Sequence, residues 1–442
     1  MVGEWREVRL GEIAEIYDGP HATPKKTDNG PIFLGISNLS RGRLDLSNTE
    51  HVSENDFHRW TRRVEPEEGD VVFSYETRLG EAARVPHGLR CCLGRRMGLL
   101  RARGGLVDPR FLLYAYLGPD FQDTLYSRTI HGSTVDRIPL INMPHFPIVI
   151  PGNIQEQRRI AHILGTLDDK IENNRKTAKT LEAMAQAIFK SWFVDFDPVR
   201  AKIAGEPRES ICKRLKLTPE ILDLFPDRLV DSELGEIPEG WGVGMLDNLA
   251  AMVTDSTSPG RSPKTVFEHY SIPAFDAGRI PAMELGESIK SNKYVVKCGA
   301  VLVSKLNPHT PRIWLPAIGD GAAICSTEFM QFVPHDLEDR PYFYCLMVSR
   351  AMQEEVLKHV TGSTGSRQRA QPSQIAKVRI LSPRSCVKKV FTQRASTLLQ
   401  AVTENLTASR TLAALCDTLL PKLISGEIRV VVTHGCSEEM PV

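Results

Sequence analysis

The sequence lacks the segments that carry a protein into or across a membrane. None of its apolar runs reaches 18 residues, and no short apolar stretch follows a basic N-terminus. Its nine cysteines include no Cys-x-x-Cys pair, and Cys91 and Cys92 are adjacent. This usage predicts reduced thiols rather than a disulfide framework or a zinc site. We therefore expect a cytoplasmic protein without membrane insertion.

Motifs that carry catalysis are also absent. The sequence has no phosphate-binding G-x-x-x-x-G-K-S/T loop, no H-E-x-x-H pair and no G-x-S-x-G elbow. Asn307-Pro308 is followed by His309, which departs from the Asn-Pro-Pro-aromatic motif of amino-methyltransferases. Pro119-Asp120 and Pro226-Asp227 lack the carboxylate-x-Lys that completes a metal-dependent nuclease motif. We expect no catalytic residue, no metal ion and no bound cofactor in this chain.

Composition and charge are those of an ordinary globular protein. The 442 residues are 41% hydrophobic and 25% charged, with a net charge of +1, and they suffice for two or three domains. Three stretches hold basic residues without any acid: six in 82–107, five in 288–319 and nine in 356–403. Such stretches predict a positive surface that attracts phosphate. The alternative is that these residues pair with acids brought from elsewhere by the fold.

A long helical pattern occurs twice. Apolar positions spaced alternately by three and four residues are typical of a helix that packs along another helix. In the first copy they are Leu164, Leu167, Ile171, Asn174, Ala178, Leu181, Ala185, Ile188 and Trp192. At a separation of 231 they return as Ala395, Leu398, Val402, Asn405, Ser409, Leu412, Cys416, Leu419 and Leu423. An Asn at the same position in both copies predicts a marker of helix register.

The repeat extends to the segments before each helix. Matched pairs are Trp5 with Trp241, Phe111 with Tyr342, Gly69–Ser74 with Gly299–Ser304, and Gly132–Thr134 with Gly362–Thr364. Their separations stay between 230 and 236 residues and their order is kept. We interpret the chain as two tandem copies of one unit, a globular module followed by a long helix.

The predicted fold is mixed α/β (α+β). Strands are expected at 32–36, 71–74, 97–101, 301–303 and 324–332, and amphipathic helices at 109–126 and 341–359. The predicted divisions are a module at 1–152, a long helix at 153–200, a linker at 201–235, a second module at 236–384, a second long helix at 385–428 and a tail at 429–442. Asn153 and Glu156 form the expected cap of the first long helix. We expect the two helices to pack antiparallel, related by a pseudo-two-fold axis. The alternative is that each helix packs only on its own module.

Specific motifs resemble a known family. The run from Leu181 to Val199, LEAMAQAIFKSWFVDFDPV, closely resembles the central conserved region of type I restriction–modification specificity subunits, the HsdS proteins. Leu419–Ile428 resembles their distal conserved region, and Ile237–Trp241 resembles the start of a target recognition domain. The resemblance covers essentially the whole chain. One departure is that the Phe-Val-Asp-Phe-Asp-Pro segment has no counterpart after the second helix, so the copies differ where partner proteins would bind.

The resemblance implies a subunit that is not an enzyme. It implies two target recognition domains that each read half of a bipartite, asymmetric site in double-stranded DNA, with a gap set by the helix pair. Two methyltransferase (modification) subunits would supply S-adenosylmethionine, and motor–nuclease (restriction) subunits would supply ATP hydrolysis with Mg²⁺. Two alternatives remain: a coiled-coil scaffold that does not read DNA, and the recognition half of a fused methyltransferase or nuclease.

Candidate DNA-contacting residues lie in the matched polar and basic loops. Arg and Gln can pair with base edges, and Ser and Thr hydroxyls suit phosphates, although Gly-Ser-Thr also makes plain turns. The candidates are His21, Lys25, Ser74, Tyr75, Arg78, Arg128, His131, Ser133, Thr134, Lys305, Asn307, Ser363, Thr364, Ser366, Arg367, Gln368 and Arg369. Outward charges on the first long helix, such as Lys170 and Lys179, are expected to stay in solvent unless they meet phosphates or partner helices.

Overall fold

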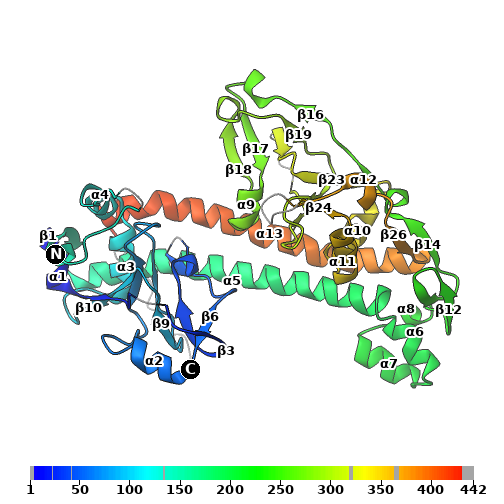
Figure 1. The fold of residues 1–442 in the computed structure, drawn as a ribbon, viewed down its shortest axis with the longest axis horizontal. Helices are drawn as coiled ribbons and strands as arrows, with labels where there is room; N and C mark the ends of the chain where they lie inside the picture. Colours follow the sequence, from blue (N-terminus) through cyan, green and yellow to red (C-terminus); the bar gives the residue numbers. More distant parts are fainter. Residues whose placement is uncertain are drawn as a thin grey trace, which may run out of the picture. The chain divides into compact units, whose positions relative to one another are not determined.

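The computed structural model describes residues 4–21, 23–40, 42–132, 135–317, 322–362 and 368–430. The chain divides into two compact units, Met1–Ile171 with Thr411–Val442, and Glu172–Arg410 (Figure 1). The two long helices, α5 (Ile154–Phe193) and α13 (Ser385–Ile424), have 40 residues each. Each long helix contributes one part to the first unit and one part to the second.

The first unit contains three main sheets. They are β1 (Trp5–Arg9) with β11 (Pro147–Pro151); β2 (Ala14–Asp18), β10 (Met97–Ala102), β7 (Val71–Ser74) and β8 (Ala82–Arg84), in that order; and β6 (Glu50–Val52), β3 (Lys26–Leu34) and β9 (Cys91–Leu93). A short pair joins β4 (Leu39–Ser40) to β5 (Arg43–Leu44). The helices are α1 (Leu10–Ile13), α2 (Glu54–Trp60), α3 (Pro109–Leu117) and α4 (Pro119–Ser127). Only the pairing of β3 with β9 is parallel among the described strands of this unit.

The second unit repeats this topology and adds two strands, β16 and β19, to the third sheet. Its sheets are β14 (Gly242–Met245) with β26 (Arg379–Ser382); β15 (Ala250–Met252), β23 (Phe329–Pro334), β20 (Val301–Ser304) and β21 (Ile313–Trp314); and β16 (Ser256–Thr257), β19 (Lys293–Val295), β22 (Ala322–Cys325), β17 (Val266–Tyr270) and β18 (Ala282–Leu285). β24 (Val360–Thr361) pairs with β25 (Arg369–Ala370). The helices are α9 (Ile272–Asp276), α10 (Arg340–Val348), α11 (Arg350–Lys358) and α12 (Pro372–Ile375). The parallel pair β17–β22 corresponds to β3–β9.

The two predicted amphipathic helices are each broken into two, so these predictions were wrong in the same way. The 109–126 segment forms α3 and α4, because Pro119 lacks an N–H and holds Gly118 in an extended conformation. The 341–359 segment forms α10 and α11, and there Ser349 makes the break by accepting a hydrogen bond from the Met352 amide. The expected strand at 324–332 is likewise split between β22 and β23.

The predicted fold class is confirmed, and the two long helices pack together. In the first unit Leu164 of α5 shares a hydrophobic cluster with Leu423 and Ile424 at the end of α13. In the second unit Phe189, near the end of α5, packs on Phe391, near the start of α13, with ring centroids 5.7 Å apart. The helices are therefore antiparallel. All predicted inward positions of both helices are buried or half-buried.

The segment between α5 and β14 is folded. It forms α6 (Asp197–Ile203), α7 (Arg208–Leu215), α8 (Pro219–Leu222), β12 (Leu229–Ser232) and β13 (Gly235–Pro238). Phe196, Ile211 and Phe225 are buried and join the cluster that holds Trp192 and Trp241. The Phe-Val-Asp-Phe-Asp-Pro segment, unique to the first copy, therefore caps the core of the second unit. Phe196 makes the turn in a left-handed conformation, with φ of 56°.

Short 3-10 turns complete the described elements: η1 (Ile36–Asn38), η2 (Met143–His145), η3 (Leu246–Asn248), η4 (Pro259–Arg261), η5 (Gly286–Ser288) and η6 (Leu337–Asp339). Within the described residues, no helix has the length and apolar character needed to span a bilayer. The cysteines in the same ranges are free, and burial raises the pKa of Cys91 and Cys92 to about 12.

Candidate nucleic-acid interface

The loops after β7 and β20 have the same backbone design. The Ser74 hydroxyl donates to the carbonyl of Glu76 at 2.7 Å, and the Ser304 hydroxyl donates to the carbonyl of Leu306 at 3.0 Å. The third residue after each Ser is left-handed, with φ of 69° at Thr77 and 49° at Asn307. A side-chain hydrogen bond to the backbone two residues on stabilises such a turn locally. The matched sequences therefore build matched loops.

A second loop reaches each of these turns. Glu76 forms an isolated bridge with Arg137, and Leu306 forms one with Arg369. The Ile138 amide donates to the Tyr75 carbonyl at 2.8 Å, and the Ala370 amide donates to the Lys305 carbonyl at the same distance. The structure thus brings together two candidate loops that the sequence separates by more than 50 residues, and it does so in both units.

The candidates differ in exposure. Ser74 and Tyr75 are buried, so they support the first loop from within. Arg78, Arg128 and His131 are exposed, as are His21, Lys25 and Arg369, whereas Lys305, Asn307 and Gln368 are half-buried. Asn307 Oδ1 is buried without a hydrogen-bond donor among the described residues. Ser133, Thr134, Ser363, Thr364, Ser366 and Arg367 lie outside the described residues.

Several exposed candidates already have acidic neighbours. Arg78 lies 3.2 Å from Glu81, His131 lies 3.3 Å from Asp136, and Arg369 lies 3.1 Å from Glu328. In the first unit Glu76 pairs with Arg96 at 2.7 Å. In the second unit Leu306 stands in place of Glu76, and Glu328 stands in place of Arg96. Equivalent loops therefore present different charges. Such exposed pairs contribute little stability and can exchange for phosphate at small cost.

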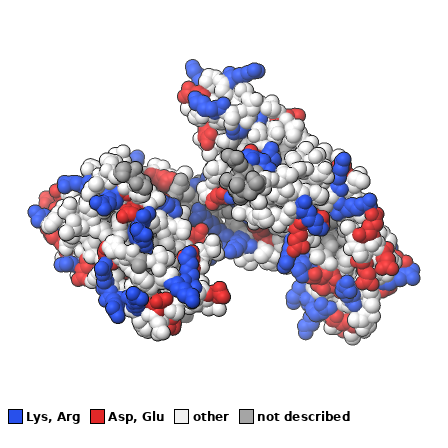
Figure 2. All heavy atoms as spheres, viewed as in Figure 1, with Lys and Arg blue, Asp and Glu red and all other residues white. Residues whose placement is uncertain are grey.

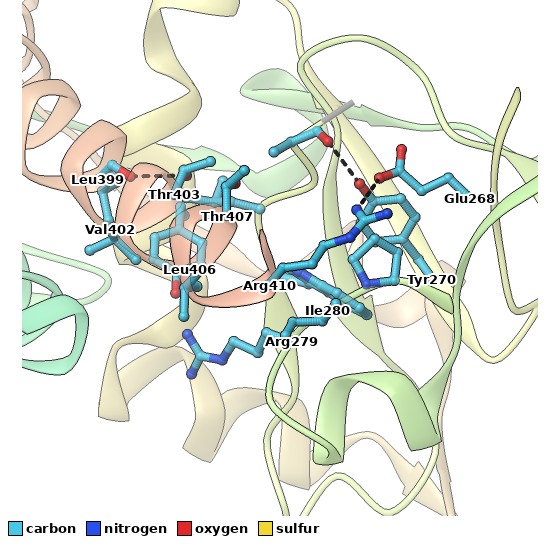
Figure 3. Close-up of a pocket in the computed structure, with 15 residues that line it drawn as sticks. Glu268, Tyr270, Arg279, Ile280, Leu399, Val402, Thr403, Leu406, Thr407 and Arg410 are labelled. Carbon is cyan, nitrogen blue, oxygen red and sulfur yellow. Dashed lines mark hydrogen bonds and ion pairs between the residues drawn. The ribbon is translucent and has the colours of Figure 1, made fainter. Parts of the chain in front are cut away.

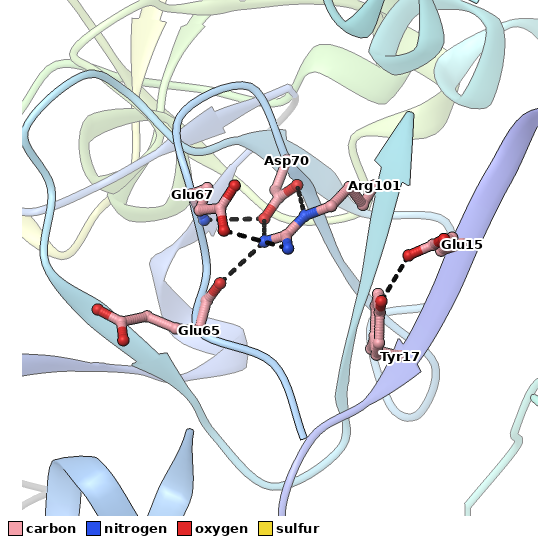
Figure 4. A network of polar contacts seen from close by, with 6 residues as sticks. All are labelled: Glu15, Tyr17, Glu65, Glu67, Asp70 and Arg101. Carbon is pink, nitrogen blue, oxygen red and sulfur yellow. Dashed lines mark hydrogen bonds and ion pairs between the residues drawn. The ribbon is translucent and has the colours of Figure 1, made fainter. Parts of the chain in front are cut away.

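Nine of the 20 basic residues in the acid-free stretches form salt bridges among the described residues, so the alternative interpretation holds for about half of them. Arg90 forms a bidentate pair with Glu54 at 2.7 Å. Arg101 contacts the buried Asp70 at 2.7 Å and Glu67 at 3.2 Å (Figure 4). In the second unit Arg312 pairs with Asp276, and Lys388 with Asp339. Figure 2 accordingly shows basic and acidic side chains interspersed over the visible face.

Each module is also tied to α5 by partly buried polar contacts. In the first unit Asp168 accepts from Tyr114 at 2.7 Å and from Arg43 at 2.8 Å. In the second unit Glu182 accepts from Tyr344 and from Arg279, the latter at 2.9 Å. Burial, followed by the neighbouring carboxylate, raises the pKa of both tyrosines, so both hydroxyls stay protonated donors.

A pocket of about 340 Å³ lies beside α13 in the second unit. Its walls are mostly apolar, with Trp314, Leu399 and Leu406 among them (Figure 3). Within the pocket the Arg410 side chain extends towards Glu268, and the guanidinium lies 3.7 Å from the carboxylate. Arg279, the third charged residue of the lining, pairs with Glu182 of α5, so each charged group of the pocket has a partner of opposite charge.

Sequence reasoning missed one basic cluster. Arg59, Trp60, Arg62 and Arg63 lie at and just after the end of α2, where they line a pocket with His21. The available signal was the run His-Arg-Trp-Thr-Arg-Arg at 58–63, which interleaves an aromatic ring with cations. The acids that follow in sequence obscured it.

Comparisons with known proteins agree with this architecture. Residues 3–183 match the family model described as type I restriction modification DNA specificity domain. The chain is 24% identical over 379 residues to the HindI specificity subunit of Haemophilus influenzae, covering 75% of this chain and 80% of that one. It is 25% identical over 436 residues to the MjaIX specificity subunit of Methanocaldococcus jannaschii, covering 95% and 89%.

The fold has a solved counterpart. The S subunit of a type I restriction–modification system from M. genitalium aligns over 98% of this chain and 97% of its own, with a TM-score of 0.54 and 14% identity. The likeness includes two β-rich domains and two long helices packed together. The family expected from the sequence is confirmed, and so is the role of a DNA specificity subunit. This chain belongs to the family of type I restriction–modification specificity subunits and is a DNA specificity subunit of such a system.

Proposed function

We propose that this subunit reads a bipartite, asymmetric site in double-stranded DNA, one half with each module. The observation that carries the proposal is the pair of matched loops, which keep one backbone design and change their side chains. Glu76 and Thr77 in the first unit stand where Leu306 and Asn307 stand in the second. Since base readout depends on side-chain donors and acceptors, unlike side chains on one scaffold predict unlike half-sites.

The antiparallel helix pair is the proposed spacer. Its seam is apolar apart from Asn174, Asn405 and Ser409, and its positions are buried or half-buried within each unit, which favours a helical spacer over a flexible linker. A two-fold arrangement of readers matches the two-fold geometry of duplex DNA, and the separation of the readers then fixes the gap between half-sites. The domain divisions predicted from the sequence, with modules at 1–152 and 236–384, are the proposed exchangeable parts.

In this proposal partner subunits carry out the catalytic reactions. Two methyltransferase subunits bind S-adenosylmethionine and methylate adenine, and motor–nuclease subunits use ATP and Mg²⁺ to translocate and cut DNA. The described residues contain no cluster of His, Cys, Asp or Glu suited to a metal ion. The assembly works in the cytoplasm, where its DNA is found.

The test is to co-express the chain with its methyltransferase partner and to map methylated adenines across the host genome. We expect one split motif with two unlike halves and a constant gap. Replacing residues 1–152 with another module should change one half and leave the other. A contiguous motif, or two independent motifs, would contradict the proposal.

The same experiment separates the two alternatives. Methyl transfer by the purified chain alone supports a fused enzyme. A complex with the methyltransferase that binds no DNA, or binds it independently of salt, supports a scaffold, because phosphate contacts make protein–DNA affinity fall steeply with salt.

A further inference from the structure

Three chain segments meet in the first unit at the backbone of Tyr75, the residue after β7. Its amide donates to the Arg96 carbonyl at 3.2 Å, and its carbonyl accepts from the Ile138 amide at 2.8 Å. Arg96 lies in the turn just before β10. In the second unit the Lys305 amide donates in the same way to the Glu328 carbonyl at 2.9 Å, just before β23. The turns before β10 and β23 are therefore the third segment of each candidate interface.

The side chains on this common backbone frame carry different charges in the two units. In the first unit Arg96 Nε lies 2.7 Å from Glu76 Oε2, and the terminal nitrogens of Arg96 donate no hydrogen bond to the described residues. In the second unit Glu328 occupies the position of Arg96, and both of its oxygens accept from Arg369 at 3.1 Å. The Arg96–Glu76 pair thus leaves two neighbouring donors for a ligand, whereas the Arg369–Glu328 pair is closed on itself.

The backbone is unusual on both sides of the Arg96–Glu76 pair. Arg96 is left-handed, with φ of 72°, and so is Thr77 beside Glu76, with φ of 69°. This conformation is uncommon for residues other than glycine and is an outlier for a β-branched residue such as Thr. Glu328 makes the equivalent turn without a positive φ. Because such strained residues cluster where ligands bind, the strain in the first unit marks its turn as a candidate contact.

The Arg96–Glu76 pair reaches solvent and suits a base edge better than a phosphate. The two side chains are 35% and 22% exposed. The carboxylate repels a phosphate, which has the same sign of charge. In the major groove a G·C pair presents two adjacent acceptors, guanine N7 and O6, followed by the amino donor of cytosine. Two donors of an arginine beside the acceptor of a glutamate complement this order, and an A·T pair presents a different one.

We propose that Arg96 and Glu76 read a G·C base pair in the half-site of the first module. The terminal nitrogens of Arg96 donate to guanine N7 and O6. Glu76 holds the guanidinium in position and accepts from the cytosine amino group. The second module reads differently at this position, because Leu306 and Glu328 replace the two residues. The inference rests on the proposed DNA-reading function and adds to it the residues and the base pair.

Methylation mapping of variants tests this assignment in the chain co-expressed with its methyltransferase partner. We expect Arg96→Ala and Arg96→Gly to relax one G·C position of the first half-site to any base pair, with the second half-site and the gap unchanged. Glycine adopts a positive φ freely, so Arg96→Gly keeps the turn even where Arg96→Ala disturbs it. Arg103→Ala removes an exposed charge just past the other end of β10 and is the matched control. It should return the wild-type motif.

Binding measurements with the purified complex give the second readout, and they also cover a variant that methylates too weakly to map. Duplexes carry the mapped motif with each G·C pair of the first half-site replaced in turn by A·T. Wild type should discriminate against one replacement about tenfold or more. Arg96→Gly should bind that duplex and the parent duplex equally, and Glu76→Gln should reduce the discrimination severalfold without removing it.

Three results would overturn the inference. They are a first half-site without a G·C pair, an unchanged motif in both Arg96 variants, and a uniform loss of affinity for all duplexes with a salt dependence reduced by about one counterion, which indicates a phosphate contact. Each of these leaves DNA reading by the two modules intact. The absence of any split motif in wild type would instead contradict the proposed function itself.

Discussion

Tyr114 and Tyr344 lie 230 positions apart, and each donates its hydroxyl proton to a carboxylate on α5. The acceptor is Asp168 in the first unit and Glu182 in the second. By strict repetition of the sequence the second acceptor would lie on α13, at Leu399, where no acid is present. The second copy therefore keeps the tyrosine, but the carboxylate that accepts its proton lies on α5 and not on α13.

Removing the Tyr344 hydroxyl should destabilise the second unit. Tyr344 is 2% exposed, and in Tyr344→Phe the Glu182 carboxylate keeps only Arg279 as a partner among the described residues. A lost hydrogen bond to a charged group costs about 1.5–3 kcal/mol. We expect a lower midpoint in urea for the transition that reports the second unit. Tyr126→Phe, at a side chain that is 74% exposed, is the control; equal midpoints for both variants would show that the contact is not stabilising.

The stability of the second unit should fall on mild acidification. Burial lowers the pKa of His269 below its ordinary value, and this outweighs the opposing effect of Glu284 at 3.1 Å. Because the unfolded chain takes up the proton more readily, the folded state is fully favoured above the unfolded pKa of about 6.5 and loses stability as pH falls below it. Melting temperatures at pH 7.5 and 5.5 should differ less in His269→Gln than in wild type. A pH dependence that is the same in both proteins would assign the effect to other groups.

Local and periodic features of the fold could be predicted from the sequence. The seam from Leu164 to Trp192 was readable because helix periodicity forces those side chains onto one face. The helix break at Gly118 could also be predicted from Pro119. The equivalent break at Ser349 could not, because it depends on a side-chain cap that Ser forms in some contexts and not in others.

Pairings over long separations were not readable. Arg90 with Glu54 and Arg101 with Asp70 join residues 36 and 31 positions apart, so basic residues in an acid-free stretch of sequence have acidic partners in space. The meeting of the loops at Glu76 and Arg137 depends on the same tertiary placement. Both loops were nevertheless predicted from the sequence as candidate DNA-contacting loops, because the internal repeat matches them and this match requires no knowledge of contacts.

Asn174 should reduce stability while it fixes register. Its side chain is 4% exposed, and Nδ2 has no acceptor among the described residues, whereas Asn405 Nδ2 donates to the Ala401 carbonyl at 2.7 Å. An unsatisfied buried amide costs about 1–3 kcal/mol. Asn174→Leu should therefore raise the melting temperature, and Asn405→Leu should raise it less. A lower melting temperature for Asn174→Leu would mean that the amide has a partner in solution.

Shortening both long helices by one heptad should shorten the gap in the DNA site. Deleting 175–181 from α5 and 406–412 from α13 removes matched segments, so the remaining seam positions stay in step. Seven residues correspond to about 10 Å of helix, or about three base pairs at 3.4 Å each. Methylation mapping should return the same two half-sites with a gap reduced by about three. Deleting 175–181 alone leaves the seams mismatched and should abolish methylation. An unchanged gap in the double deletion would show that something other than the helix pair sets the spacing, because the modules and their loops are identical in the two proteins.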